Sequence, residues 1–191
     1  MLDGIKIGVA LTGSFCTISN SIREIEKIKS KGAIVTAIVS EHVRSMDTRF
    51  GKASDILKQL EDITNKKVIS SIPDAERIGP NKLFDIMLIA PCTGNTLAKI
   101  ANSIVDTTVT MAAKSHIRNQ RPLVLSIATN DGLGNSACNI GKVINQKNIY
   151  LVPFGQDDHK NKPNSLIAKV DMIVPTIEEA LSGKQIQPVL I

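Results

Sequence analysis

Residues Leu83–Ser103 read LFDIMLIAPCTGNTLAKIANS, and this stretch decides the fold that we predict for the chain. The run 83–90 is apolar except for Asp85, which favours a strand buried inside a parallel sheet. We expect Pro91 to end the strand pairing, because proline has no N–H to donate. The small polar residues 92–96 then form a turn. A helix follows, with its apolar residues at helical spacing: Leu97, Ile100, Ala101 and Ile104.

The turn 92–96 is a candidate binding site as well as a chain reversal. Backbone N–H groups and the positive end of a helix dipole favour an anion or a polar ring edge at a helix start. In an open α/β sheet, ligands lie at the carboxyl ends of the strands. Most strand-to-helix turns bind nothing, however, so this segment alone leaves both interpretations open.

The composition predicts one compact domain over residues 1–191. The apolar fraction of 42% is enough for a sizeable core. The net charge is +5, but the basic residues are scattered among acidic ones, and only 3% of the residues are aromatic. Stacking platforms for bases are therefore scarce, so we expect no nucleic-acid partner, while the excess of cations suits an anionic small ligand.

Cysteine and histidine usage favours a reducing compartment and offers no metal site. The cysteines are odd in number and widely spaced: Cys16, Cys92 and Cys138. The histidines show no ligand spacing: His42, His116 and His159. The start of the chain has no basic signal segment, and no apolar run is long enough to cross a membrane. We therefore expect a cytoplasmic protein with no metal and no membrane partner.

Strands and helices alternate along the rest of the chain. Further strands are predicted at 5–11, 33–39, 68–69, 122–128 and 149–152, the last being the final one. Further helices are predicted at about 17–30, from a cap at Ser54, at 108–118, around 140–144, and from a capping box formed by Thr176 and Glu179. Segments 41–52 and 72–82 are predicted to be loops, and Gly32 and Gly183 to end helices.

This alternation predicts an α/β fold with a single doubly wound, mainly parallel sheet and helices on both faces. Four strands end in turns of small polar residues, at Gly13-Ser14, Ser40, 92–96 and 129–135. Because the carboxyl ends of parallel strands share one edge, these turns predict a ligand with a phosphate and polar ring atoms.

Several motifs resemble the flavoprotein superfamily, which includes FMN-dependent cysteine decarboxylases and flavin prenyltransferases. The resemblance is carried by Thr12-Gly13-Ser14 and by Pro91–Thr96, which fits the pattern P-x-[ST]-x-N-T and continues into an A-K-I-A-N segment. It implies a Rossmann-like flavoprotein fold and an FMN cofactor. The residues that it implies for the cofactor are Gly13, Ser14, Ser40, Thr93, Gly94, Asn95 and Thr96.

Within that superfamily, the chain resembles the B subunits of dipicolinate synthase from spore-forming bacteria. The resemblance lies in DTRFG at 47–51, MAAK at 111–114, VPFGQDD at 152–158 and KPNS at 162–165. It implies that the chain acts with a separate A subunit, which carries the acceptor NADP, to oxidise dihydrodipicolinate to dipicolinate in the mother cell during sporulation. It also implies a homo-oligomer.

A small dicarboxylate substrate needs cations or N–H donors in pairs. Arg49 is the preferred cationic candidate, ahead of Arg44, although a solvated loop charge is the alternative for both. Polar candidates that follow strands are Asn130, Asp131, Gln156 and Asp157, and a simple turn is the alternative for 130–132. Cys92 is interpreted as a buried small hydrophobe, and Lys99 and Lys114 as solvated helix residues, with contact to a phosphate as the alternative for Lys114. No catalytic residue is identified.

The chain departs from the decarboxylases of the superfamily at two places. Their active-site histidine has no counterpart in 66–84, and their substrate clamp P-x-M-N-x-x-M-W is replaced by Ala128-Thr129-Asn130-Asp131. Cysteine decarboxylation is therefore the least favoured function. A non-redox role, in which the chain binds substrate or stabilises the A subunit without a flavin of its own, stays open.

Overall fold

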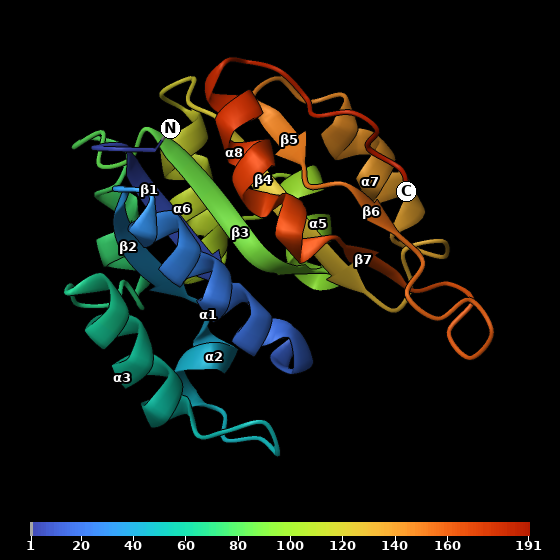
Figure 1. Cartoon of the computed structure of the whole chain (residues 1–191), viewed down its shortest axis with the longest axis horizontal. Coiled ribbons are helices and arrows are strands. Elements are labelled where there is room, and N and C mark those ends of the chain that lie inside the picture. Colours follow the sequence, from blue (N-terminus) through green and yellow to red (C-terminus); the bar gives the residue numbers. More distant parts are fainter. Residues whose placement is uncertain (1) are drawn as a thin grey trace.

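The computed structural model describes residues 2–191 as a twisted sheet between two layers of helices (Figure 1). The seven-stranded sheet has the order β2-β1-β3-β4-β7-β6, and β5 also pairs with β4. The parallel strands are β1 Lys6–Leu11, β2 Ile34–Val39, β3 Ile86–Thr93, β4 Leu123–Thr129 and β5 Ile149–Leu151. The antiparallel strands are β6 Phe154–Gly155 and β7 Leu166–Ala168. The predicted α/β class is confirmed.

The helices cover both faces of the sheet. One face carries α1 Phe15–Ser30, the 3-10 helix η1 Val170–Met172 and α8 Ile173–Leu181. The other carries α5 Gly94–Ala101, α6 Thr108–Ile117 and α7 Ala137–Ile144 (Figure 1). Three helices lie toward the β2 edge or against α6: α2 Glu41–Ser45, α3 Ala53–Thr64 and α4 Ile72–Glu76.

The central strands are buried as their apolar runs predict. In β3, every residue from Ile86 to Cys92 is buried, and in β1 every residue after Lys6 is buried. Burial on both faces is expected for parallel strands that lie between helical layers. The core is therefore continuous across the sheet, and it fixes the strand ends on which the polar turns are mounted.

Pro91 does not end β3, so that prediction is wrong. The strand continues to Thr93, and the register with β4 shifts between Ile89 and Cys92. A register shift leaves a residue outside the ladder, and a proline without an N–H is tolerated there. The Ala90–Pro91 peptide is cis.

Several helix boundaries also differ from the predictions. Helix α1 begins at Phe15 and α5 at Gly94, two and three residues earlier than the apolar spacing indicated. Ser54 lies inside α3, after Lys52, and does not cap it. Thr176 lies inside α8 and donates a hydrogen bond to the Met172 carbonyl at 2.6 Å. Its hydroxyl therefore bonds backward along the helix and does not cap it.

The predicted loops 41–52 and 72–82 contain the short helices α2 and α4. Each is capped by a serine, because the Ser40 hydroxyl accepts from Val43 N and the Ser71 hydroxyl accepts from Asp74 N. Helices of five residues show too little apolar periodicity to be recognised in a sequence. The short strand predicted at 68–69 is present as a single bridge residue, Ile69, which pairs in parallel with Ile38. Gly183 ends α8 as predicted and has φ +75°.

The strand at 149–151 is not the last one, since β6 and β7 follow it. These strands have two and three residues, too few for an alternating pattern. β5 pairs with the first half of β4, and β7 pairs with Ala128 and Thr129 at its end. The segment between β6 and β7 consequently lies beside the carboxyl end of β4. Within residues 2–191, no helix is long and apolar enough to cross a membrane.

Gly8 should tolerate no side chain. A Cβ on Gly8 would lie 2.5 Å from the ring of the buried Phe84, so Gly8→Ala should lower the free energy of unfolding by about 1–3 kcal/mol through overpacking. Gly141→Ala is the matched control, because a Cβ on Gly141 meets nothing within 4 Å and α7 gains a better helix former. Urea unfolding should show it stabilised by about 0.5–1 kcal/mol. Equal effects of both changes would contradict the close packing at Gly8.

Candidate functional site

The polar turns converge at the carboxyl edge of the parallel strands, where they line two adjoining pockets. The rim cleft has a volume of about 700 Å³ and the side pocket about 370 Å³. Both are lined by Gly13, Thr93 and Asn95, which therefore form the wall between them. The side pocket is further lined by Thr12, Phe15, Ser40, Glu41, His42, Met46, Thr96, Lys99 and Thr107.

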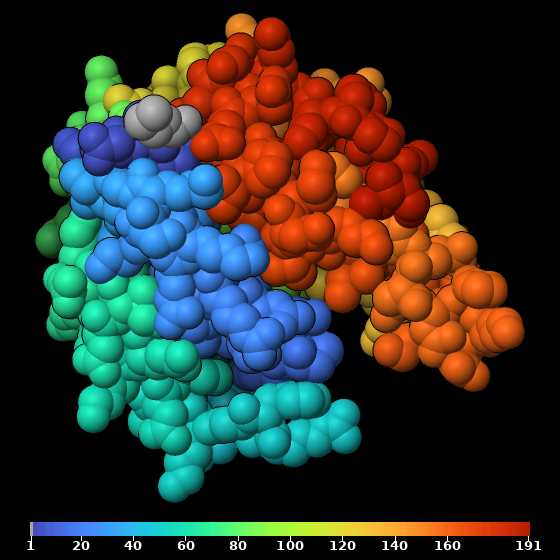
Figure 2. Space-filling model, viewed as in Figure 1, coloured from blue at the N-terminus to red at the C-terminus, as the bar shows by residue number. Residues whose placement is uncertain are grey.

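The rim cleft opens between the start of α1 and the segment that joins β6 to β7. Figure 2 shows the corresponding notch between the blue surface of α1 and the orange lobe. On the side of β4 the cleft is lined by Asn130 and Asp131. On the side of the segment that joins β6 to β7 it is lined by Asp157, Lys162 and Ser165. Most of its other polar lining is neutral: Ser14, Thr17, Thr129, Asn135, Ser136 and Asn139.

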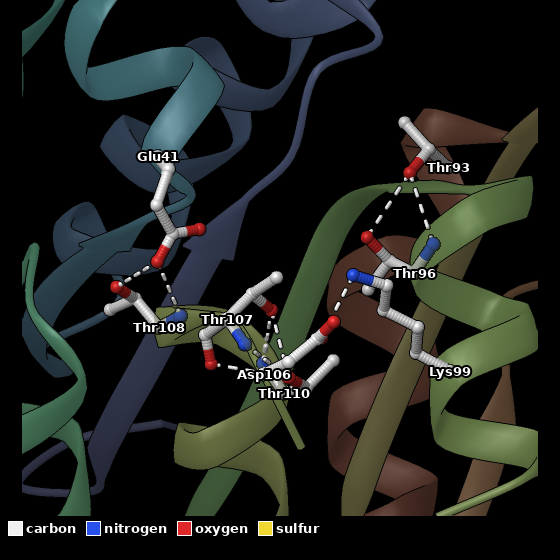
Figure 3. Close-up of polar contacts among 8 residues, drawn as sticks. All are labelled: Glu41, Thr93, Thr96, Lys99, Asp106, Thr107, Thr108 and Thr110. Atoms are coloured by element: carbon white, nitrogen blue, oxygen red, sulfur yellow. Dashed lines mark hydrogen bonds and ion pairs between the residues drawn. The ribbon is translucent and has the colours of Figure 1, made fainter. Parts of the chain in front are cut away.

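The turn from β3 into α5 is built by hydroxyl groups. The Thr93 hydroxyl accepts from Thr96 N at 3.3 Å and so caps α5 (Figure 3). The Thr12 hydroxyl donates to the Pro91 carbonyl at 2.7 Å and accepts from Thr93 N at 3.1 Å. The amides of Gly94 and Asn95 belong to the same first turn, whose N–H groups have no carbonyl partner within the helix. Donor groups are thus concentrated at the shared wall.

Glu41 joins the Ser40 turn to α6. Its Oε1 accepts from Thr108 N at 2.8 Å and from the Thr108 hydroxyl at 2.7 Å (Figure 3). Burial opposes ionisation, yet these hydrogen bonds outweigh it, so the pKa of Glu41 lies below its ordinary value. The carboxylate is charged at neutral pH and stabilises the positive end of α6.

Lys99 is held on the other side of the side pocket. Its Nζ lies 2.8 Å from Asp106 Oδ1, and its side chain is only 20% exposed. Figure 3 shows Lys99 pointing from α5 to the start of α6, opposite Glu41. The prediction of a solvated helix residue is therefore wrong for Lys99, because the approach of α6 supplies a partner that the local sequence does not reveal.

Asp131 is organised by two hydroxyl groups. Its Oδ1 accepts from the hydroxyls of Thr129 and Ser136, the latter at 2.9 Å. These bonds, that of Thr129 first, keep the pKa of Asp131 below its ordinary value. A Cβ on Gly94 would lie 2.6 Å from the Thr129 hydroxyl and 3.1 Å from Asp131 Oδ1. Only glycine at position 94 lets this cluster lie against the start of α5 without a shift.

The structure brings most of the predicted site residues together. Gly13, Thr93 and Asn95 line both pockets, whereas Ser40 and Thr96 line the side pocket. The remaining ones that line a pocket are in the rim cleft: Ser14, Gly94, Asn130 and Asp131.

Arg49 and Gln156 line neither of these pockets. The Arg49 guanidinium lies over the Phe50 ring, 4.8 Å from its centre, and Gln156 Nε2 donates to the Pro163 carbonyl at 2.8 Å. Arg44 likewise donates to the Ser70 carbonyl at 3.1 Å. Within one chain, Arg49 and Gln156 contact residues of their own loops and Arg44 contacts the loop at Ser70, so none of the three side chains lines the cleft.

Sequence reasoning missed several lining residues: Thr17, Glu41, Ser136, Lys162 and Ser165. The KPNS motif at 162–165 was a signal for two of them. It acquires a place in the site only through the pairing of β7 with the end of β4. Glu41 and Ser136 carried no signal, because a side chain that bonds to a distant backbone N–H or to a nearby carboxylate resembles any polar loop residue in the sequence.

Two buried groups stay electrically neutral. Burial raises the pKa of the Cys92 thiol to about 12, which agrees with its interpretation as a buried hydrophobe. Burial also lowers the pKa of His116 to about 4, and one of its ring nitrogens, Nε2, lies 2.9 Å from the Pro122 carbonyl. Within residues 2–191, no three His, Cys, Asp or Glu side chains are grouped to hold a metal ion.

Comparison with known proteins identifies the family. The family model described as Flavoprotein matches residues 1–174. The chain belongs to the flavoprotein family. It is also 47% identical over 190 residues to the B subunit of dipicolinate synthase from Bacillus subtilis (strain 168), a match that covers 100% of this chain and 95% of that protein. Within the flavoprotein family, it therefore belongs with the dipicolinate synthase B subunits.

Solved structures agree with this assignment. The crystal structure of the dipicolinate synthase B subunit from Bacillus halodurans matches with a TM-score of 0.92 and 43% identity, covering 100% of this chain and 97% of that one. The FMN-dependent cysteine decarboxylase SpaF matches with a TM-score of 0.70 and 17% identity, covering 95% and 98%. The second likeness shows that this flavoprotein shares the fold of the decarboxylase.

Glu41→Gln should weaken the cap of α6 and lower the free energy of unfolding by about 0.5–2 kcal/mol at neutral pH. Because the folded-state pKa is lowered from 4.5, this contribution is full above that pH and is lost as the pH falls through the folded value. Urea unfolding at neutral pH and at about pH 3 should therefore show a difference that shrinks in acid. Glu26→Gln, on the exposed side of α1, is the control and should change little. A difference independent of pH would contradict the capping role.

Proposed function

We propose that this flavoprotein is the B subunit of a dipicolinate synthase and acts with a separate A subunit to oxidise dihydrodipicolinate to dipicolinate. The observation that supports this most is the pair of adjoining pockets in a chain 47% identical to such a protein over its full length. Two pockets that adjoin and share lining residues suit a reaction in which a planar cofactor and a small substrate must lie side by side.

We propose that FMN is the cofactor, and that it binds in the side pocket against Gly13, Thr93 and Asn95. The donor set fits it, since the hydroxyls of Ser40, Thr93 and Thr96 and the first-turn amides of α5 suit a phosphate, a ribityl chain or ring carbonyls. Among the described residues that line the side pocket, Glu41 carries the only carboxylate. It already accepts two hydrogen bonds from Thr108, so it opposes an anion less than a free carboxylate would. When bound, a flavin supplies hydride acceptance.

The substrate is proposed to occupy the rim cleft, against Asn130 and Asp131. Oxidation removes a hydride and a proton from dihydrodipicolinate, and the electrons pass in the net reaction to NADP, which we propose is held by the A subunit. The aromaticity of the product drives the step. The task of the protein is therefore to hold the ring beside the wall of Gly13, Thr93 and Asn95 and to recognise the carboxylates.

We further propose a homo-oligomer in the cytoplasm of the mother cell of a sporulating bacterium. Met46, which lines the side pocket, is 46% exposed, and Phe50 in the following loop is 51% exposed. Exposed apolar side chains beside an open pocket favour a second copy of the chain that completes it.

The experiment is reconstitution of the purified chain with the A subunit, dihydrodipicolinate and NADP. Pyridine absorbance should rise well beyond that obtained when the purified chain is left out, and the purified chain should show flavin absorbance. Dipicolinate formation without flavin absorbance would favour the non-redox role. No gain on addition of the chain would reject the proposal, and release of CO2 from a peptidyl or pantothenoyl cysteine would revive the decarboxylase.

Asn95→Ala should weaken FMN binding about tenfold, because the variant loses an amide at the shared wall. Alanine is a good helix former, so the first turn of α5 should persist and a loss of binding would not reflect unfolding. Gln59→Ala, on the exposed side of α3, is the matched control and should bind FMN as the wild-type chain does. Flavin fluorescence titration measures both. Equal affinities for the two variants would place the flavin elsewhere.

A further inference from the structure

Lys162 carries a charge that sets it apart in the rim cleft. Among the residues of 2–191 that line the cleft, it is the only lysine, arginine or histidine. The cleft also contains the carboxylates of Asp131 and Asp157, so the net charge of its lining is −1 with Lys162 and would be −2 without it. A dicarboxylate that enters this space meets one side chain capable of a charge-assisted hydrogen bond to it.

The backbone of Lys162 is held in a defined turn. Lys162 N donates to the Asp158 carbonyl at 2.8 Å, and Ser165 N donates to the Lys162 carbonyl at 3.0 Å. Ser165 is buried and lies next to β7, which pairs with the end of β4. The position of Lys162 at the mouth of the cleft is therefore set by the sheet.

The ammonium group of Lys162 can form further hydrogen bonds beside its ion pair with Asp157. Its Nζ lies 3.7 Å from Asp157 Oδ2, which is longer than a charge-assisted hydrogen bond, and the side chain is 55% exposed. Asp157 is held independently by a hydrogen bond from the Ser165 side chain, which is the first cause of its lowered pKa. A lysine ammonium has three N–H donors, so a ligand carboxylate can approach it from the cleft.

We propose that Lys162 binds one carboxylate of the dicarboxylate substrate and that Asp157 competes with the substrate for the same ammonium group. This inference rests on the proposed function, which supplies the dicarboxylate. On the β4 wall, the carboxylate of Asp131 repels a second carboxylate, and its Oδ1 already accepts hydrogen bonds from the hydroxyls of Thr129 and Ser136. The substrate therefore lies with a carboxylate toward Lys162, and the ring edge that carries no carboxylate faces Asp131.

The test uses dipicolinate as the probe and isothermal titration calorimetry as the measurement. Lys162→Met should raise the dissociation constant for dipicolinate about tenfold, because the cation is lost. Asp157→Asn should lower it about threefold, because a negative charge near the dianion is removed while the amide oxygen still accepts from Ser165. Lys160→Met is the matched control, since Lys160 is exposed on the same segment and does not line the cleft.

The opposite signs separate binding from a structural role. If Lys162 served only to pair with Asp157, both substitutions would break the same pair and change affinity and thermal midpoint in the same direction. Lys162→Arg keeps the charge and should recover most of the affinity. In the reconstituted system, Lys162→Met should raise KM for dihydrodipicolinate more than it lowers kcat. Equal effects of Lys162→Met and Lys160→Met, or no dipicolinate binding by the wild-type chain, would overturn the inference.

Failure of the inference differs from failure of the proposed function. Dipicolinate synthesis in the reconstituted system, combined with unchanged binding by Lys162→Met, would reject the role of Lys162 and leave the function standing. Dipicolinate binding that weakens in Lys162→Met and tightens in Asp157→Asn, in a chain that supports no synthesis, would reject the function and support the dicarboxylate site.

Discussion

The hydroxyl of Thr12 joins the ends of β1 and β3, and the arrangement of both pockets depends on this contact. It donates to the Pro91 carbonyl and accepts from Thr93 N, at the point where the pairing of β3 with β4 changes register. A shift in a ladder leaves backbone groups without their regular partners, and a buried hydroxyl can satisfy both a donor and an acceptor there. Thr93 is thereby placed to cap α5 and to form the wall between the pockets.

The two pockets differ in how their charges are used. In the side pocket, Glu41 and Lys99 both point to the start of α6, where Thr108 and Asp106 hold them. Their charges fix helices in place, and the hydroxyl and amide groups of the pocket lie beside the apolar side chains of Phe15 and Met46. In the rim cleft, Asp131 and Lys162 are only partly neutralised by their neighbours. The first environment suits the phosphate and polar edge of a cofactor, and the second can discriminate between charged substrates.

The site could be predicted where it depends on local sequence. Gly13, Ser40 and Thr93–Thr96 lie at the ends of apolar runs that predict buried parallel strands. Because the carboxyl ends of parallel strands lie at one edge of the sheet, the sequence predicted that these residues lie together. Arg49 and Gln156 were chosen by residue type in polar segments, and the folded loops engage them with Phe50 and Pro163. Residue type identifies what a side chain can bind, but the conformation of its own loop decides which partner it meets.

The sequence by itself determined the alternation of buried strands and amphipathic helices, and hence a parallel sheet with polar turns along one edge. Burial of apolar residues is a property of each segment, so it can be recognised without the rest of the chain. Only the tertiary structure decided that β7 reverses against the end of β4, that Lys99 meets Asp106, and that Lys162 reaches the cleft. The strand β7 is too short to show an alternating pattern of apolar residues. Lys99 meets a carboxylate on another segment and Lys162 lies in a cleft lined by other segments, so the sequence near either lysine does not predict these contacts.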